Sequence, residues 1–455
     1  MLTARLTGFR DATNEAIKAR LAGRAVAQAR TPGLGCQIDF GQNPRTPQAA
    51  RKRLVIAAVR DESRRPFAMK ILVAPDKFKG SLPAVVAVAA ITRGLRAVWP
   101  DAEISAAPIA DGGEGFAETL CMALGGEWVE TRALDPIGRE VAARYAWVEA
   151  EKLAIIEMSE ASGLWRLTKD ERAPRRANTF GTGQLIRHAT ERGARKILVG
   201  LGGSATTDGG VGMAAALGYE FLTSDGEELE LHPDKFIAIT RIQADSAIEL
   251  PEIIAACDVQ NPLLGARGTA HVFSPQKGAG EMDIVVLEAG LSALADAVTT
   301  DLGCDFRDTP GAGAAGGIAF GLMSFCGAQV CSGFDLVAET LRLEERIAAT
   351  DLVITGEGRI DGQTLEGKGP AGVAALARKH GKPVLALAGS VAQNSAVDAL
   401  FDATAGIIDE PVTLDAAMTR GAEFLERAAE RAGRLIQLGS RLGEIRNKSE
   451  KHEII

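Results

Sequence analysis

The sequence predicts an α/β protein with two domains, one built on a Rossmann-like parallel sheet and one on a mixed sheet. Short apolar runs that fit buried strands alternate with helical segments along much of the chain. Several of these runs end in loops rich in glycine and polar residues. The length of 455 residues is enough for two or more domains, each with its own core.

Composition and charge exclude several classes of protein. Glycine accounts for 51 of 455 residues, about 11% against a usual ~7%, and the excess lies mainly in four loops. No apolar run reaches 18 residues, so we expect no transmembrane helix. The six cysteines lack the spacing of a zinc site. We therefore expect free thiols and a cytoplasmic location, where thiols stay reduced.

Residues 1–68 differ from the rest of the chain. They carry 13 Lys and Arg against 5 Asp and Glu, whereas the whole chain has a net charge of −8. The remainder is therefore acidic, which argues against a nucleic-acid partner. The segment fits an upstream extension of a gene that starts at Met69, a targeting peptide or an accessory arm. We favour the extension, because serines are few and no signal-type apolar core is present.

The first domain is predicted to alternate strands and helices. The expected elements are a strand over 70–74, a polar turn over 76–80, a helix from Ser81 to about Val98, a strand over 104–109, the loop 111–115 and a helix over 116–124. The rhythm of strand and helix, with short glycine loops, implies a parallel sheet covered by helices.

The middle of the chain, residues 128–310, is predicted to be a second domain inserted into the first. Alternating runs over 145–149 and 153–156 indicate strands of a mixed or antiparallel sheet. The parallel rhythm then returns over 311–445, with strands over 351–355 and 383–388 and helices over 370–380 and 416–438. Residues 446–455 are predicted to be a polar, frayed tail.

The stretch 196–212 contains the most informative loop. A predicted apolar strand is followed by a loop of glycines and hydroxyl residues and then by a predicted helix. Such an arrangement points backbone N–H groups at an anion. Asp208 is the one ionisable residue of this loop. A carboxylate beside phosphates is repelled unless it holds Mg²⁺ or takes a proton. The alternative is a tight turn in which Asp208 caps the next helix.

Two further loops follow predicted strands, where open α/β sheets bind ligands. Lys77 and Lys79 in the first loop can meet an anion, or lie on a solvated turn. Asp111 and Glu114 in the second can hold Mg²⁺, or form a capping box on the next helix.

Other motifs carry less information. Residues 362–369 nearly match a P-loop, but Gly369 replaces the required Ser or Thr, so only a phosphate contact by Lys368 is kept as a prediction. Residues 311–316 fit a dinucleotide fingerprint but follow no clear strand. No Ser or Cys stands in a nucleophile-elbow motif. The loops together indicate a phosphate-binding enzyme or a kinase that uses Mg²⁺.

Eight ordered motifs resemble those of bacterial glycerate kinases of the two-domain type, similar to glycerate 2-kinases. They are Met69–Gly80, Ile109–Phe116, Asn178–Gly183, Gly200–Gly210, Cys257–Leu263, Pro275–Ala279, Pro310–Gly317 and Thr355–Asp361. The resemblance covers roughly residues 69–445 and leaves residues 1–68 outside.

The resemblance implies phosphorylation of D-glycerate by ATP with Mg²⁺, in a cleft between two α/β domains. The expected product is 2-phosphoglycerate. A kinase forming 3-phosphoglycerate and a non-catalytic glycerate- or nucleotide-binding protein remain alternatives. The expected partners are small molecules only, with no membrane and no nucleic acid, and the expected state is a monomer or homodimer.

The resemblance also suggests roles for particular residues. Proton transfer or metal binding would fall to Asp208, Asp258 or Asp361, and the substrate carboxylate to Lys77, Lys79 or Arg359. ATP would be bound by Gly202, Gly203, Ser204, Thr206, Gly313, Gly316 and Lys368. The metal would be held by Asp111 and Glu114.

Overall fold

The structure is a computed structural model that describes residues 69–362, 364, 369–392 and 399–452. The predictions for residues 1–68 and for Lys368 lie outside these described residues.

The first sheet has five strands, and all of them are parallel. They are β1 (Lys70–Val73), β2 (Glu103–Ala106), β11 (Leu352–Ile360), β12 (Val384–Val391) and β13 (Ala403–Gly406). Their spatial order is β13-β12-β11-β1-β2. This is the doubly wound order of flavodoxin-like sheets, in which the connections change direction between β1 and β11. Ligands bind beyond the carboxyl ends of the strands at such a switch point.

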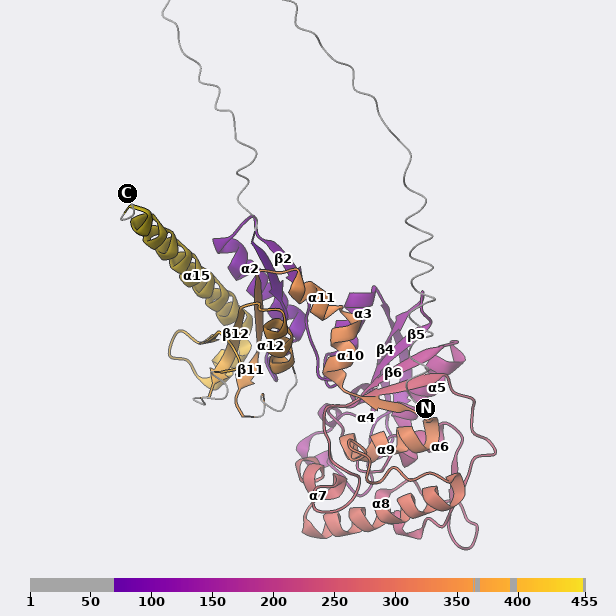
Figure 1. Ribbon diagram of the computed structural model, residues 1–455. Coiled ribbons are helices and arrows are strands. Elements are labelled where there is room, and N and C mark those ends of the chain that lie inside the picture. Colours follow the sequence, from indigo (N-terminus) through magenta and orange to yellow (C-terminus); the bar gives the residue numbers. More distant parts are fainter. Residues whose placement is uncertain (1–68, 363, 365–368, 393–398, 453–455) are drawn as a thin grey trace, which may run out of the picture. The chain divides into compact units, whose positions relative to one another are not determined.

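Helices cover both faces of this sheet because alternate residues of its strands point to opposite sides. Ile71 and Val73 of β1 pack with α2 (Ala84–Val98) and α15 (Gly421–His452). Leu72 packs on the other side, in a core that includes residues of α3, α10, α11 and α12. These four helices span Phe116–Leu124, Gly333–Thr340, Leu343–Ala348 and Pro370–Lys379. Figure 1 shows α15 as a long helix near α2 and β12.

The second sheet has six strands and is mixed. They are β3 (Glu127–Leu134), β4 (Glu140–Val148), β5 (Leu153–Glu157), β6 (Lys196–Gly200), β9 (Glu252–Ala256) and β10 (Gln329–Cys331), in the order β10-β9-β6-β5-β4-β3. The pairs β3–β4 and β4–β5 are antiparallel, and β5, β6, β9 and β10 run parallel. A separate antiparallel pair joins β7 (Glu220–Leu222) and β8 (Arg241–Gln243).

The remaining helices, apart from α14 (Leu414–Thr419), follow or surround the second sheet. They are α4 (Ser159–Ser162), α5 (Phe180–Glu191), α6 (Val211–Ala216), α7 (Thr269–Phe273), α8 (Glu281–Leu302) and α9 (Ala314–Cys326). Four short 3₁₀ helices, η2 to η5, span Leu164–Arg166, Lys169–Glu171, Pro233–Ala238 and Pro275–Lys277. No helix of the described chain combines the length and the apolar character needed to cross a membrane.

The predicted fold class is confirmed, whereas several predicted boundaries differ from the structure. β10 pairs with β9, and the apolar helix α9 packs in the core of the mixed sheet, so the return to the parallel sheet comes after Cys331 rather than after Pro310. The division into two domains stays a prediction.

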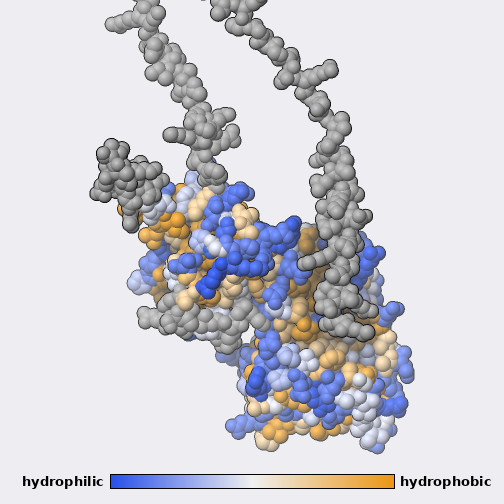
Figure 2. Space-filling model, in the orientation of Figure 1, coloured by the Kyte–Doolittle hydropathy of each residue, from blue (hydrophilic) through white to orange (hydrophobic). Residues whose placement is uncertain are grey.

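The predicted helix over 416–438 is two helices, α14 and α15, because the chain turns at Arg420. α15 continues to His452, beyond the expected start of the tail. Leu435, Leu438 and Leu442 are exposed on this helix, and Figure 2 shows hydrophobic surface along it. These three leucines of α15 therefore stay exposed.

Candidate active site

Two cavities adjoin the polar turn that follows β1. The first has a volume of about 680 Å³ and the second about 560 Å³. The residues Asp76 to Lys79 line both. This turn stands at the switch point between β1 and β11, the position at which doubly wound sheets bind their ligands.

Lys77 lies in the shared turn between two carboxylates. Its Nζ atom is 2.9 Å from Oδ1 of Asp111 and 3.7 Å from Oδ1 of Asp76. Burial opposes the charged amine, but the two acids outweigh it and raise the pKa of Lys77. The cation is therefore fixed in place and stays charged at neutral pH.

The two acids respond differently to this cation. Burial raises the pKa of Asp76 to about 6, although the charge of Lys77 opposes the rise. For Asp111, burial acts in the same direction, but the charge and hydrogen bond of Lys77 prevail and lower the pKa. Asp76 is thus the more easily protonated of the two carboxylates, and it lines both cavities.

The second cavity combines polar groups of β11 with an apolar wall. Glu357, Arg359 and Asp361 supply the polar side, and Nε of Arg359 is 2.9 Å from Oδ2 of Asp361. Burial raises the pKa of Glu357 to about 7, although a hydrogen bond from Thr364 opposes the rise. The apolar wall comes from the loop after β13 and from α14, through Ile407, Ile408, Leu414, Ala417 and Met418.

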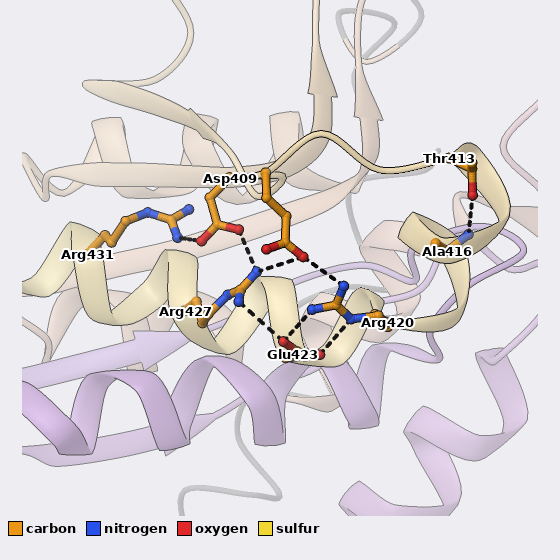
Figure 3. A network of polar contacts seen from close by, with 8 residues as sticks. Asp409, Thr413, Ala416, Arg420, Glu423, Arg427 and Arg431 are labelled. Carbon is orange, nitrogen blue, oxygen red and sulfur yellow. Dashed lines mark hydrogen bonds and ion pairs between the residues drawn. The ribbon is translucent and has the colours of Figure 1, made fainter.

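A network of ion pairs ties that apolar wall to α15 (Figure 3). Nη2 of Arg427 is 2.6 Å from Oδ1 of Asp409, and Arg431 pairs with the same carboxylate. Nη1 of Arg420 is 2.7 Å from Oε1 of Glu410. Asp409 and Glu410 directly follow the wall residue Ile408, so the network fixes the wall against a packed helix.

The other side of the first cavity comes from the mixed sheet and from α4 and η2. The sheet contributes Trp128, Arg144 and Glu157, and the two helices contribute Glu160 and Trp165. Glu157 ends β5 and accepts a hydrogen bond of 2.9 Å from the backbone nitrogen of Ala117 at the start of α3. Burial raises the pKa of Glu157 to about 7. The cavity therefore holds both an aromatic-cationic surface and a carboxyl group that titrates near neutrality.

Glycines let the loops after β2 and β6 pack backbone against backbone. A Cβ atom on Gly202 would lie 2.4 Å from the Cα of Gly113, and one on Gly200 would lie 2.7 Å from the carbonyl oxygen of Gly112. Contacts that short exclude any side chain. Glycine at Gly200 and Gly202 is therefore required by packing between the two loops.

Asp208 is an anchor of its own loop. Its carboxylate has no exposed surface and accepts hydrogen bonds from the backbone nitrogens of Thr179, Gly210 and Gly212 and from the Thr179 hydroxyl. Burial raises the pKa of this carboxyl group. A side chain so enclosed lines neither cavity.

The family model described as "Glycerate kinase family" matches residues 71–437. The chain belongs to the glycerate kinase family.

Several members of the glycerate kinase family are similar to the chain over most of its length. A glycerate kinase of Halalkalibacterium halodurans is 42% identical over 79% of this chain and 96% of its own. A glycerate 2-kinase of Escherichia coli K12 is 41% identical over 82% of this chain and 99% of its own. A crystal structure assigned to glycerate kinase 2 of Salmonella typhimurium LT2 has 40% identity and a TM-score of 0.74, covering 82% of this chain and all of that one.

About half of the predicted site residues line the cavities of this glycerate kinase family member. They are Lys77, Lys79, Asp111, Glu114, Gly203, Arg359 and Asp361. Asp111 lines the second cavity and Glu114 the first, and their role as a metal-binding pair stays a prediction. Within the described residues, no three His, Cys, Asp or Glu side chains form a group able to hold a metal ion.

The other predicted residues that the structure describes do not line the two cavities, and the roles suggested for them stay predictions. Asp258 accepts hydrogen bonds from the Ser332 hydroxyl and the Gly333 nitrogen. Ser204, Thr206 and Asp208 are buried, and Gly202 packs on Gly113. Gly313 and Gly316 pack on protein backbone, since a Cβ there would lie 2.2 Å from the Pro262 oxygen and 1.9 Å from the Thr206 oxygen. These glycines therefore serve close packing of backbone against backbone.

Several residues that line the cavities were missed as site residues. Among them are Asp76, Trp128, Arg144, Glu157 and Glu357. Glu157 ends β5 and Asp76 lies in the turn after β1, so the rule applied to Lys77 would also have found them, whereas Glu357 lies within β11. Trp128 and Arg144 lie on antiparallel strands and carry no motif, so only the fold reveals them.

Proposed function

We propose that the protein phosphorylates D-glycerate with ATP and Mg²⁺ and forms 2-phosphoglycerate. The observation that carries the proposal is the position of Lys77, a charged group held at the turn that two adjoining cavities share. Phosphoryl transfer depends on positioning and on neutralisation of charge, and it requires two substrates to meet at one point. The family membership and the glycerate 2-kinase of Escherichia coli support the choice of acceptor.

We assign ATP to the second cavity. Its apolar wall of Ile407, Ile408, Leu414 and Met418 suits an adenine ring, as cofactor sites are mainly apolar. Its opposite side carries Arg359 beside the carboxyl end of β11, where an open α/β sheet binds nucleotides. The γ-phosphate would then extend toward Lys77.

We assign glycerate to the first cavity. The Asp76–Lys79 turn lines it, so a hydroxyl group bound there would reach the shared turn. Asp76 is the group placed to accept the hydroxyl proton, because it lines both cavities and its pKa is about 6. The hydroxyl oxygen forms a bond to the γ-phosphorus, the bond from that phosphorus to ADP breaks, and the proton passes to Asp76.

The residues of the second cavity fit a bound Mg²⁺. Magnesium in kinases is usually held by one or two carboxylates together with the phosphates of the nucleotide. Asp111 and Asp361 both line this cavity, and the lowered pKa of Asp111 keeps its carboxylate ionised. When bound, the ion would neutralise phosphate charge. Asp111 and Asp361 would hold and orient it.

A coupled assay of ADP release tests the proposed function. We expect release that requires D-glycerate, saturates with it and stops when Mg²⁺ is chelated. ADP release at the same rate with and without D-glycerate would contradict a role as glycerate kinase. Binding of both compounds without any release would favour the non-catalytic alternative.

A further inference from the structure

Arg144 is an oriented cation on the wall of the first cavity. It lies on β4, and its guanidinium carbon is 4.0 Å from the centre of the Trp128 ring. Its Nε atom lies 3.3 Å from Oε1 of Glu160. A planar guanidinium that is stacked on one side and paired at Nε has little freedom to turn.

The supports of Arg144 are themselves fixed. Arg166 donates through Nε to the backbone oxygen of Glu160 at 2.6 Å and through Nη2 to the oxygen of Ala142 at 2.8 Å. These bonds tie α4 to β4. Glu160 therefore stands at a set distance from the strand that carries Arg144.

The terminal nitrogens of Arg144 remain available for a ligand. Within the described residues, Nε alone of this side chain takes part in a hydrogen bond or ion pair. The side chain is 48% exposed and lines the first cavity. Its two Nη atoms can therefore donate a parallel pair of hydrogen bonds to a carboxylate.

The charge around the first cavity makes such a cation necessary. The acidic residues that line it are Asp76, Glu114, Glu118, Glu157 and Glu160, whereas its cations are Lys77, Lys79 and Arg144. Lys77 is already paired with Asp76 and Asp111. Lys79 is exposed, and a lysine offers a point charge without the planar fork. Of the three cations, Arg144 is therefore the one best suited to bind an anionic acceptor.

We propose that Arg144 binds the carboxylate of the acceptor through both Nη atoms, with Trp128 and Glu160 as positioning residues. The inference rests on the proposed function, because it takes the acceptor to be a small hydroxy acid in the first cavity. It differs from the sequence-based expectation, which gave the carboxylate to Lys77, Lys79 or Arg359.

Binding and kinetics with D-glycerate and its neutral amide, D-glyceramide, test the inference. Calorimetry on the full chain, with a non-hydrolysable ATP analogue present, gives Kd for each compound, and the coupled assay gives kcat and KM. For Arg144→Gln we expect binding of D-glycerate to weaken at least about tenfold, the lower end for a hydrogen bond to a charged group. Binding of D-glyceramide and the KM for ATP should stay within about threefold, well inside that tenfold step. Arg144→Lys should be intermediate.

Arg192→Gln is the matched control. Arg192 also stacks on a tryptophan, with its guanidinium carbon 5.1 Å from the Trp147 ring, and also pairs with a glutamate, Glu127, at 3.2 Å. It lines neither cavity. We expect normal binding of both compounds, because the loss of an arginine–tryptophan stack outside the cavities should not change the ligand site.

The possible outcomes separate the inference from the proposed function. Equal weakening of both compounds in Arg144→Gln, or unchanged binding of D-glycerate, would overturn the role of Arg144 while the proposed function stands. A native chain that binds D-glycerate but transfers no phosphate contradicts the proposed function. In that case the Kd values still test whether Arg144 binds the carboxylate. A native chain that does not bind D-glycerate overturns both.

Discussion

The Nζ atom of Lys77 lies 2.9 Å from Oδ1 of Asp111, and the two residues belong to loops that follow the neighbouring parallel strands β1 and β2. The side chain of Lys77 is only 17% exposed. The ion pair therefore holds a permanent positive charge at the place where the two cavities meet.

Lys77→Ala should lower kcat by roughly 10²–10³, the usual scale for loss of one electrostatic contact to a transition state. The reason is that the cation at the shared turn disappears. Lys196→Ala is a control, because Lys196 pairs with Glu252 at 3.3 Å at the start of β6 and lines neither cavity. Steady-state kinetics and thermal unfolding measure both variants. A collapse of stability in Lys77→Ala with normal turnover of the surviving protein would show that Lys77 serves only the fold.

Glu357 should make the free energy of unfolding fall as pH rises from about 4.5 to 7. Its folded pKa is about 7, above the ordinary 4.5, so the folded state binds a proton that the unfolded state has lost. The stabilisation is complete below the ordinary pKa and is lost as pH rises through about 7.

Glu357→Gln should remove that dependence and be more stable than the native chain at pH 8, by on the order of 2 kcal/mol. Glutamine keeps an oxygen for the hydrogen bond from Thr364. Glu140→Gln, at an exposed carboxylate paired with Arg132, should leave the pH dependence unchanged. Urea unfolding at several pH values measures all three proteins. Parallel curves for the native chain and Glu357→Gln would refute the raised pKa.

Asp208→Asn should lower stability by about 1–3 kcal/mol, because the new amide would face a backbone nitrogen that now donates to the carboxylate. Turnover per folded molecule should change far less than the 10²–10⁴ expected for loss of a general base. Thr179→Val, which removes the hydroxyl donor to Asp208, should show the same pattern. A large fall in kcat with native stability would instead show that Asp208 takes part in catalysis.

Arg427→Ala should raise the KM for ATP severalfold without changing the KM for D-glycerate. Arg427 links Asp409 and Glu423, and its loss should loosen the apolar wall of the second cavity (Figure 3). The loss of stability should be at most about 1 kcal/mol, as is usual for exposed ion pairs. Arg93→Ala breaks an ion pair with Glu426 between α2 and the same helix α15. Neither residue lines the second cavity, so both KM values should stay unchanged. A rise in the KM for D-glycerate alone would place ATP elsewhere.

The parallel sheet was predictable because its buried strands are short apolar runs, and such runs indicate buried strands. Ile71, Leu72 and Val73 are each fully buried, and the polar turn that follows them forms the shared part of both cavities. The position of Lys77 therefore followed from the rule that ligands bind at strand ends.

The roles of the glycine loops were not predictable from composition. A glycine that approaches a phosphate and a glycine that approaches another backbone look identical in sequence. Gly316 approaches the Thr206 oxygen, and Gly202 approaches Gly113, so both serve packing. Arg144 was missed for the opposite reason. It belongs to no motif, and only the fold, through β4, places it at the first cavity.

Phosphorus NMR of the product made from D-glycerate and ATP tests the proposed reaction most directly. Phosphate on the 2-oxygen is attached to a carbon with one hydrogen, whereas phosphate on the 3-oxygen is attached to a carbon with two. Beside the signals of ADP, we predict one new phosphate monoester signal that proton coupling splits into a doublet, which identifies 2-phosphoglycerate. A triplet would contradict transfer to the 2-oxygen, and the absence of any new phosphate ester would contradict the assignment as a glycerate kinase.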